Sequence, residues 1–249
     1  MTLIPDIDMT QLSAIAAQDG PLSQQVYQIL KQAILSLDFP PGAVLRKPTI
    51  CARLGVSRAP VSEAITRLSE DGLVEVIPQS ATRVAYFSMP EIREGAFLRE
   101  ALEIAAVGKV AQDRTETQLT QLNRTLRLQA LLAEDGDFQG FYEADEAFHA
   151  QIMQFTGFAR LTDVAQKVSL QVTRARILLL PSPGRMSETL QEHRAVFEAI
   201  HAQDPQAAQT RLRHHLGQLM PRIAKLAEER PRLFRPLAQP GPPASTKRA

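Results

Sequence analysis

The residues best suited to chemistry in this chain of 249 residues are its five histidines. One of them, His149, follows Asp145 by four positions inside a segment with helical spacing. Side chains four apart lie on the same face of a helix, so this carboxylate and imidazole could bind one cation together. The same spacing is typical of a surface ion pair or a hydrogen-bonded core pair, and on its own it leaves these alternatives open.

The remaining histidines lie in two later segments, which also have helical spacing. His193 is part of a Gln-Glu-His-Arg run, and the pair His214 and His215 lies near the end of the last long segment. Helices of a bundle can direct such groups into one interior, as in known bundle metal sites. A divalent-metal site built from three helices is therefore one hypothesis for this half of the chain.

The elements that must position these groups are helices, because residues 90 to 228 show apolar spacing of three and four almost throughout. Asp204 followed by Pro205 is a typical helix start, with a capping residue before a proline in the first turn. The expected helices span 90–112, 116–134, 137–155, 158–179, 186–202 and 205–228. An all-α bundle over 88–228 follows from this pattern.

The preceding part of the chain has a different plan. A helix from Leu22, two short helices at 47–54 and 58–71, and a two-stranded hairpin up to residue 87 fit within about 65 residues, which is the plan of a winged helix-turn-helix. Five basic residues face one acid between 46 and 67, although residues 1–87 carry a net charge near zero. Local positive charge favours DNA binding, with a helical adaptor as the alternative.

Composition limits the class of protein. The formal net charge is +1, 44% of residues are hydrophobic, and the single Cys51 cannot form an internal disulfide. The start lacks the basic and apolar pattern of a secretory signal, and no apolar run is long enough to span a membrane, so we expect a cytoplasmic protein. Residues 1–20 are expected to form a flexible arm and the proline-rich 229–249 a disordered tail.

Residues 22–87 resemble the DNA-binding domain of GntR-family bacterial transcription regulators. The resemblance rests on PPGAVL, LGVSRAPVSEAITRL and DGLVEV, which have the order and spacing of that family. It implies that Arg58 and its neighbours at the helix start contact bases in the major groove and that the hairpin tip enters the minor groove. Ser57, Ala59, Pro60 and Ser62 are assigned by position, and Lys47, Arg67 and Arg83 are candidate phosphate contacts or plain solvated charges.

The sequence also departs from the GntR pattern. Ser62 stands where the family commonly has arginine, Lys47-Pro48 replaces a Glu-Arg-like pair, and the wing lacks the usual glycine near Gln79-Ser80. These departures leave Arg58 as the base contact that the resemblance supports best.

Residues 97–217 resemble the all-helical ligand-binding domain, called FCD, of the FadR-like branch of this family. The resemblance rests on Arg99 to Glu103, on the segments that carry the histidines, and on 204–208. It implies that a divalent metal is bound by Asp145, His149, His193 and His215. Neutral imidazoles and one carboxylate suit zinc first, with nickel, manganese or cobalt as alternatives.

This ligand set leaves open positions and a single positive charge on the ion, which favour a small carboxylate effector. Arg99 matches the family's arginine and is a candidate second anchor for that effector, while an ion pair with Glu103 is the alternative. His214 points about 100° away from its neighbour, and His201 is expected at the surface. Phe158 replaces a common asparagine of the family.

The expected function is that of a homodimeric, non-enzymatic transcription regulator. Repression is the commoner outcome in the family and is the expected one here. Two winged modules would bind a double-stranded DNA operator, and the carboxylate effector at the metal would change operator affinity. A metal-ion sensor is one alternative. A metal-dependent hydrolase is another, but Glu146 and Glu192 are only sequence neighbours of the ligands and no HExxH motif is present.

Overall fold

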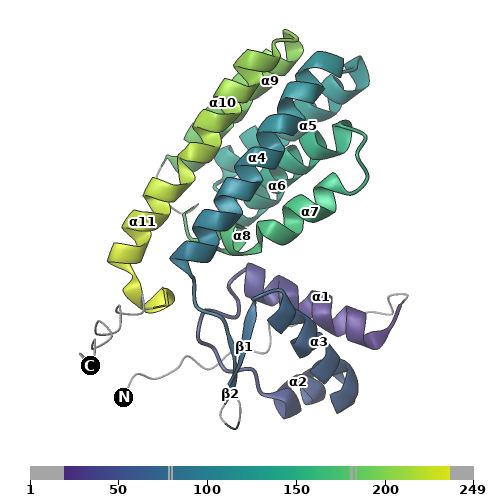
Figure 1. The fold of residues 1–249 in the computed structure, drawn as a ribbon, viewed down its shortest axis with the longest axis vertical. Helices are drawn as coiled ribbons and strands as arrows, with labels where there is room; N and C mark the ends of the chain where they lie inside the picture. The colour runs from purple at the N-terminus through teal and green to yellow at the C-terminus, as the bar shows by residue number, and fades with distance from the viewer. Residues whose placement is uncertain (1–19, 78, 80, 180–181, 183, 236–249) are drawn as a thin grey trace, which may run out of the picture.

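The computed structural model describes residues 20–235, apart from 78, 80, 180, 181 and 183. A winged head lies below a long helical bundle, and α4 leads from one into the other (Figure 1). The mainly α fold, with a winged helix-turn-helix followed by an all-helical part, agrees with the expectation from the sequence.

The head contains three helices and one antiparallel hairpin. Its elements are α1 (Leu22–Leu35), α2 (Lys47–Leu54), α3 (Arg58–Glu70), β1 (Val74–Ile77) and β2 (Ala81–Val84). Gly55 ends α2 with φ 68°, a left-handed conformation that glycine adopts at little cost and that turns the chain into α3. In the hairpin, Val74 pairs with Val84 and Ile77 with Ala81.

The wing turn shows the backbone conformation at one departure from the GntR pattern. Gln79 has φ 58°, a region that favours glycine. The glycine that the family usually has near this position would relieve that strain.

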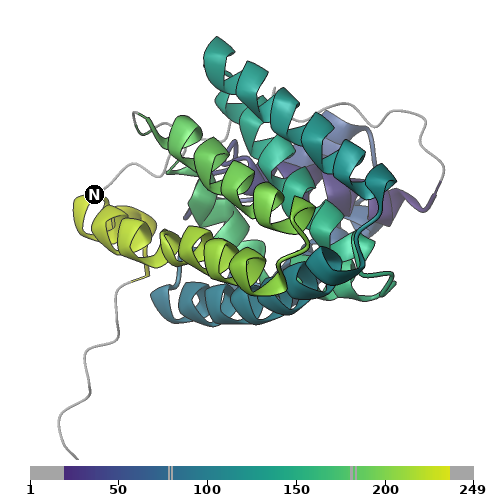
Figure 2. The same cartoon turned by 90° about the horizontal axis from the view of Figure 1, so that it is seen from above.

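The bundle is built around α4, which is 25 residues long and packs along α10 (Figure 2). Its elements are α4 (Met89–Asp113), α5 (Glu116–Asp135), α6 (Phe138–Phe155), α7 (Leu161–Val168), α8 (Leu170–Ile177), α9 (Arg185–His201), α10 (Pro205–Gly217) and α11 (Leu219–Glu229). The predicted cap is present, because the Asp204 side chain accepts a hydrogen bond from the Ala207 amide at 2.9 Å. Apolar residues of α4, α5, α6, α9 and α10 form its core.

Two of the expected helices are each divided in the structure. The segment 158–179 breaks at Ser169, where φ −98° and ψ 0° leave the α-helical region between α7 and α8. The segment 205–228 breaks at Gln218, between α10 and α11. Pro221 is the physical reason for the second break, because it has no N–H to donate to the carbonyl four residues earlier.

The last described residues correct a second expectation, since 229–235 were assigned to a disordered tail but contain regular structure. A short 3₁₀ helix, η2 (Pro231–Leu233), follows α11, and the Phe234 ring is buried 5.3 Å from the ring of Phe87. These rings belong to an apolar cluster that also contains Val172 of α8 and Ile223 of α11. The cluster joins the bundle to the segment that follows the wing. Residues 1–19 and 236–249, to which the arm and most of the tail were assigned, lie outside the described part.

Among the described residues, no helix is both long and apolar enough to cross a membrane.

Candidate metal centre and DNA-binding surface

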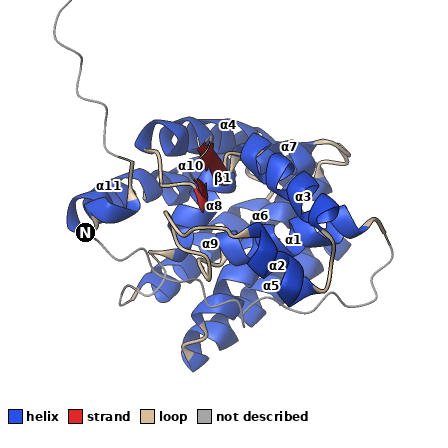
Figure 3. Cartoon of the chain, turned by 90° about the horizontal axis from the view of Figure 1, so that it is seen from below, coloured by secondary structure: helices blue, strands red, loops and turns tan. Residues whose placement is uncertain are grey.

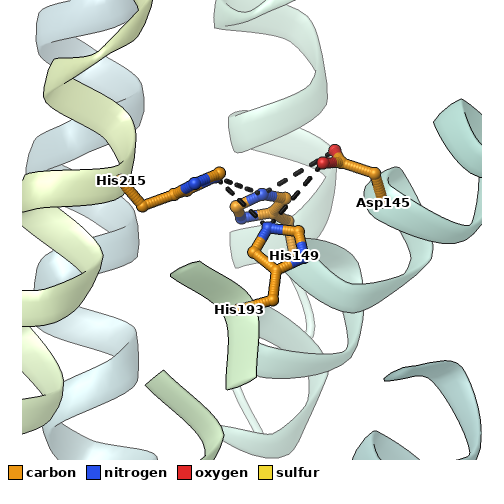
Figure 4. A group of neighbouring side chains, drawn as sticks. All are labelled: Asp145, His149, His193 and His215. Atoms are coloured by element: carbon orange, nitrogen blue, oxygen red, sulfur yellow. Dashed lines mark hydrogen bonds and ion pairs between the residues drawn. The ribbon is translucent and has the colours of Figure 1, made fainter. Parts of the chain in front are cut away.

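Asp145, His149, His193 and His215 converge on one point inside the bundle (Figure 4). They come from α6, α9 and α10, and all four are buried. The Nε2 atom of His215 lies 3.2 Å from that of His193 and 3.3 Å from that of His149. The Asp145 carboxylate oxygens lie 3.7 Å from His193 Nε2 and 3.8 Å from His149 Nε2.

These separations fit a shared ion. Ligand atoms with bonds of about 2.0–2.2 Å to one ion lie about 3.3–3.6 Å apart in a tetrahedral arrangement. The four predicted ligands therefore form a group that could hold a divalent metal. His201 and His214 are both exposed, in agreement with the expectation for each.

Each imidazole is oriented by an acceptor on its other ring nitrogen. His149 Nδ1 lies 2.6 Å from Glu103 Oε2, His215 Nδ1 lies 2.6 Å from Glu192 Oε2, and His193 Nδ1 lies 2.9 Å from Gln129 Oε1. Acceptors at Nδ1 favour the tautomer with its proton there, which leaves the Nε2 lone pairs facing the common centre.

The protonation states also suit a cation. Burial opposes ionisation of Asp145, but the charge of Arg176 and the interactions with the three neighbouring histidines together outweigh it and hold the pKa of that carboxyl far below its ordinary value. Burial lowers the pKa of His215 to about 4, and it holds the pKa of His193 well below its ordinary value together with the charge of His215. At neutral pH these two rings are neutral and Asp145 is ionised, as a metal ligand must be.

Arg99, the candidate anchor for an effector, is paired with a carboxylate of the protein. Its Nε donates to Glu103 Oε1 at 2.5 Å, and both side chains are buried. The ion pair considered as the alternative is therefore present, and it holds the carboxylate that orients His149. Arg99 also lines two cavities beside the metal-ligand group, so it remains a candidate for contact with an effector.

The sequence reasoning missed several supporting residues. Arg176 of α8 donates to Asp145 and Glu146, Gln129 supports His193, and Glu192 contacts His215. Glu192 is adjacent to His193 in sequence, and it reaches across to α10 rather than toward its neighbour. No local spacing relates α5, α8 and α10, so only the packing of the helices could identify these partners.

Two cavities flank the metal-ligand group. The smaller, about 40 Å³, is lined by Asp145 and His215 and is rich in arginine, namely Arg99, Arg176, Arg185 and Arg222. The larger, about 480 Å³, has His149 and Glu103 in its wall and reaches Lys31 on α1 of the head. The smaller cavity has the charge for an anion, with room for roughly one carboxylate group or a few waters.

The predicted base-contacting end of α3 is open to solvent. Ser57, Arg58 and Ala59 are exposed, and Pro60 is half-buried. Arg58 makes no hydrogen bond or ion pair with any residue that the structure describes. Ser57 occupies the N-cap position of α3, although its side chain makes no capping hydrogen bond there.

The four remaining DNA-contact candidates have partners within the protein. Lys47 Nζ donates to Ser62 Oγ at 3.2 Å, and Arg83 pairs with Glu75 at 2.9 Å. Arg67 donates to Gln24 and lies 4.1 Å from the ring centroid of Tyr27. Contact with phosphate would compete with these interactions.

Comparison with known proteins agrees with the architecture. The family model for the FCD domain matches residues 94–218, and that for bacterial regulatory proteins of the gntR family matches residues 22–84. Fold and matches together define a DNA-binding transcriptional regulator. Within that class, the chain belongs to the GntR family and carries an FCD domain.

Curated relatives belong to the same class. The HTH-type transcriptional repressor RspR of Escherichia coli strain K12 is 30% identical over 84% of this chain and 92% of its own length. A probable D-xylose utilization operon transcriptional repressor of Paenarthrobacter nicotinovorans is 27% identical over 82% of this chain and 89% of its own.

Among solved structures, E. coli McbR/YncC has a TM-score of 0.73 at 22% identity, covering 84% of this chain and 99% of its own, which shows a shared fold. A putative GntR regulator from Rhodococcus sp. RHA1 has a TM-score of 0.70 at 26% identity, covering 82% and 97%. The family model and RspR both describe transcriptional regulators, which supports the non-enzymatic class over the hydrolase alternative.

Proposed function

We propose that this regulator is a homodimeric repressor whose affinity for a DNA operator is set by a small carboxylate at a divalent-metal site. In this proposal residues 21–87 bind DNA and residues 88–228 bind the metal and effector and form the dimer. Repression is the function named for RspR, the 30% identical relative. Two copies of one winged head suit a near-palindromic operator, because each head reads one half-site.

The observation that carries the proposal is the convergence of three Nε2 atoms and one carboxylate, with every Nδ1 held by an acceptor. Asp145, His149, His193 and His215 would hold the ion, and zinc matches this donor set best. A bound ion would supply a positive centre with positions for an anion. The arginines of the smaller cavity would add charge on the same side.

Metal content tests the ligand assignment. The double variant His149→Ala/His193→Ala should lose the metal of the purified protein, measured by inductively coupled plasma mass spectrometry. The matched control, His201→Ala/His214→Ala, also removes two imidazoles but only exposed ones, and it should keep the metal. Full retention by the first variant would refute the assigned ligands.

A metal-ion sensor is the second candidate, and the small volume of the arginine-rich cavity favours it. DNA affinity distinguishes the two functions, measured with a duplex selected by the protein from a random library. If the effector is a carboxylate, Zn²⁺ with acetate or a larger carboxylate should change the affinity beyond Zn²⁺ alone. A full response to Zn²⁺ alone, unchanged by any carboxylate, would identify the ion as the signal.

Sedimentation equilibrium tests the dimer, which should show twice the mass of one chain at micromolar concentration. A mass of one chain for the free protein, together with one chain per bound duplex, would contradict the dimer.

A further inference from the structure

Helix α8 contacts two functionally different parts of the molecule through side chains only five residues apart. Gln171 and Arg174 reach the base of the wing, whereas Arg176 reaches Asp145 at the metal-ligand group. Positions 174 and 176 lie about 200° apart around a helix, so α8 presents one side to each region.

On the wing side, α8 holds both ends of the hairpin by their backbone carbonyls. Gln171 Nε2 donates at 2.8 Å to the oxygen of Gly72, which lies just before β1. Arg174 Nη2 donates at 3.0 Å to the oxygen of Ala85, which lies just after β2. Arg174 Nη1 also donates to Gln171 Oε1 at 3.1 Å, so the two donors are linked. Figure 3 shows α8 close to the hairpin.

Burial of the charged Arg174 side chain costs free energy. Its side chain is fully buried, its Nε has no hydrogen-bond partner in the part of the chain that the structure describes, and its guanidinium lies 4.8 Å from the Phe87 ring centroid. Burial lowers the pKa of this group to about 10. An apolar side chain could fill the same space without the penalty of a buried charge. What the guanidinium adds is a directional bond to the wing.

On the metal side, Arg176 is nearly buried and donates to Asp145 and Glu146. It also lines the arginine-rich cavity, where an anion would meet it. An ion at Asp145, or an anion beside it, would draw the guanidinium into a new set of contacts. The break at Ser169 separates α8 from α7, so α8 is a short helix of its own that contacts both regions.

We propose that α8 transmits the state of the metal centre to the wing, with Arg176 as the sensing residue and Gln171 and Arg174 as positioning residues. This proposal rests on the proposed function, because the signal is the binding of the metal or effector. It describes how that binding would regulate DNA affinity, since the wing is the part of the head expected in the minor groove.

Hydrogen exchange tests this coupling in the full-length protein without metal, so the test does not depend on metal binding. We expect Arg176→Met to speed exchange of the amides in 74–77 and 81–84 by roughly 2- to 30-fold, because it releases α8 from Asp145. Amides of α2 and α3 should keep their rates, which separates coupling from general destabilisation. The control Arg114→Met removes a largely buried arginine far from α8 and should leave the wing unchanged.

A double-variant cycle gives the decisive result. In Arg174→Met the wing should already exchange fast, and adding Arg176→Met should bring no further increase, whereas Arg174→Lys should restore part of the protection. Gln171→Met serves as the second positioning variant if Arg174→Met does not fold. Unchanged wing exchange in Arg176→Met, or independent effects of the two substitutions, would overturn the proposal. Failure of the metal site would appear only in the metal analysis described above.

Discussion

At the scale of single residues, the affinity of the metal site should depend on side chains that would not touch the ion. Gln129 is fully buried, donates to the Ala144 carbonyl at 3.0 Å and thereby turns its own oxygen toward His193 Nδ1. We expect Gln129→Leu to weaken Zn²⁺ binding by about 10- to 100-fold, since the imidazole loses the acceptor that orients it. Competition with a chromogenic chelator measures this. Gln129→Glu keeps an acceptor and should bind more tightly than Gln129→Leu, and equal affinity of wild type and Gln129→Leu would show that the ring needs no support.

Arg58 is the residue on which DNA recognition should depend. Its guanidinium is exposed at the start of α3 and free of partners among the described residues, so no internal bond must break before it contacts a base. Arg58→Ala should weaken binding to the selected duplex by about 1–3 kcal/mol at fixed salt. Arg124→Ala removes an exposed arginine from α5 and is the control. Unchanged affinity of Arg58→Ala would remove this residue from the interface.

At the scale of elements, α4 and the α7–α8 segment approach each other closely at Gly95. A Cβ at Gly95 would lie 2.7 Å from the backbone oxygen of Val168, next to the break at Ser169. Gly95→Ala should therefore destabilise the protein by about 1–3 kcal/mol, because two backbones must separate. At Gly217 a Cβ meets nothing within 4 Å, so Gly217→Ala should be neutral or stabilising by about 0.5–1 kcal/mol. Urea unfolding measures both, and equal effects would reject the close approach as the cause.

At the scale of the whole molecule, the last described residues are tied to the wing. Arg235 Nη2 donates to Glu75 Oε1 at 2.5 Å, and Arg83 binds the other oxygen of that carboxylate. Burial would raise the pKa of Glu75, but the hydrogen bonds from Arg235 and Arg83 outweigh it and lower the pKa from its usual 4.5. A carboxyl group whose pKa is lower in the folded than in the unfolded state stabilises the fold at pH values above the unfolded pKa. This contribution is lost as the pH falls through the lower, folded pKa.

Glu75→Gln should accordingly cost about 0.5–1 kcal/mol at neutral pH, a modest figure because the partners are partly exposed. The difference from wild type should shrink as the pH falls through the lowered pKa of Glu75, because the carboxylate then becomes protonated in both states. Urea unfolding at neutral pH and at successively lower pH values measures it. A difference that persists in acid would assign the effect to packing instead of charge.

The sequence by itself determined the helical class, the winged head and the identities of the four converging side chains. Helical spacing and glycine-marked turns are local, and the motifs around Arg58 and His149 are short enough to be recognised along the chain. Only the tertiary structure decided which groups support those side chains. Gln129, Glu103 and Glu192 meet their histidines across 64, 46 and 23 positions, and such contacts arise from helix packing that no local pattern encodes. The same packing places Arg174 against the wing and Phe234 against Phe87, because buried surface is shared between segments that are distant in sequence.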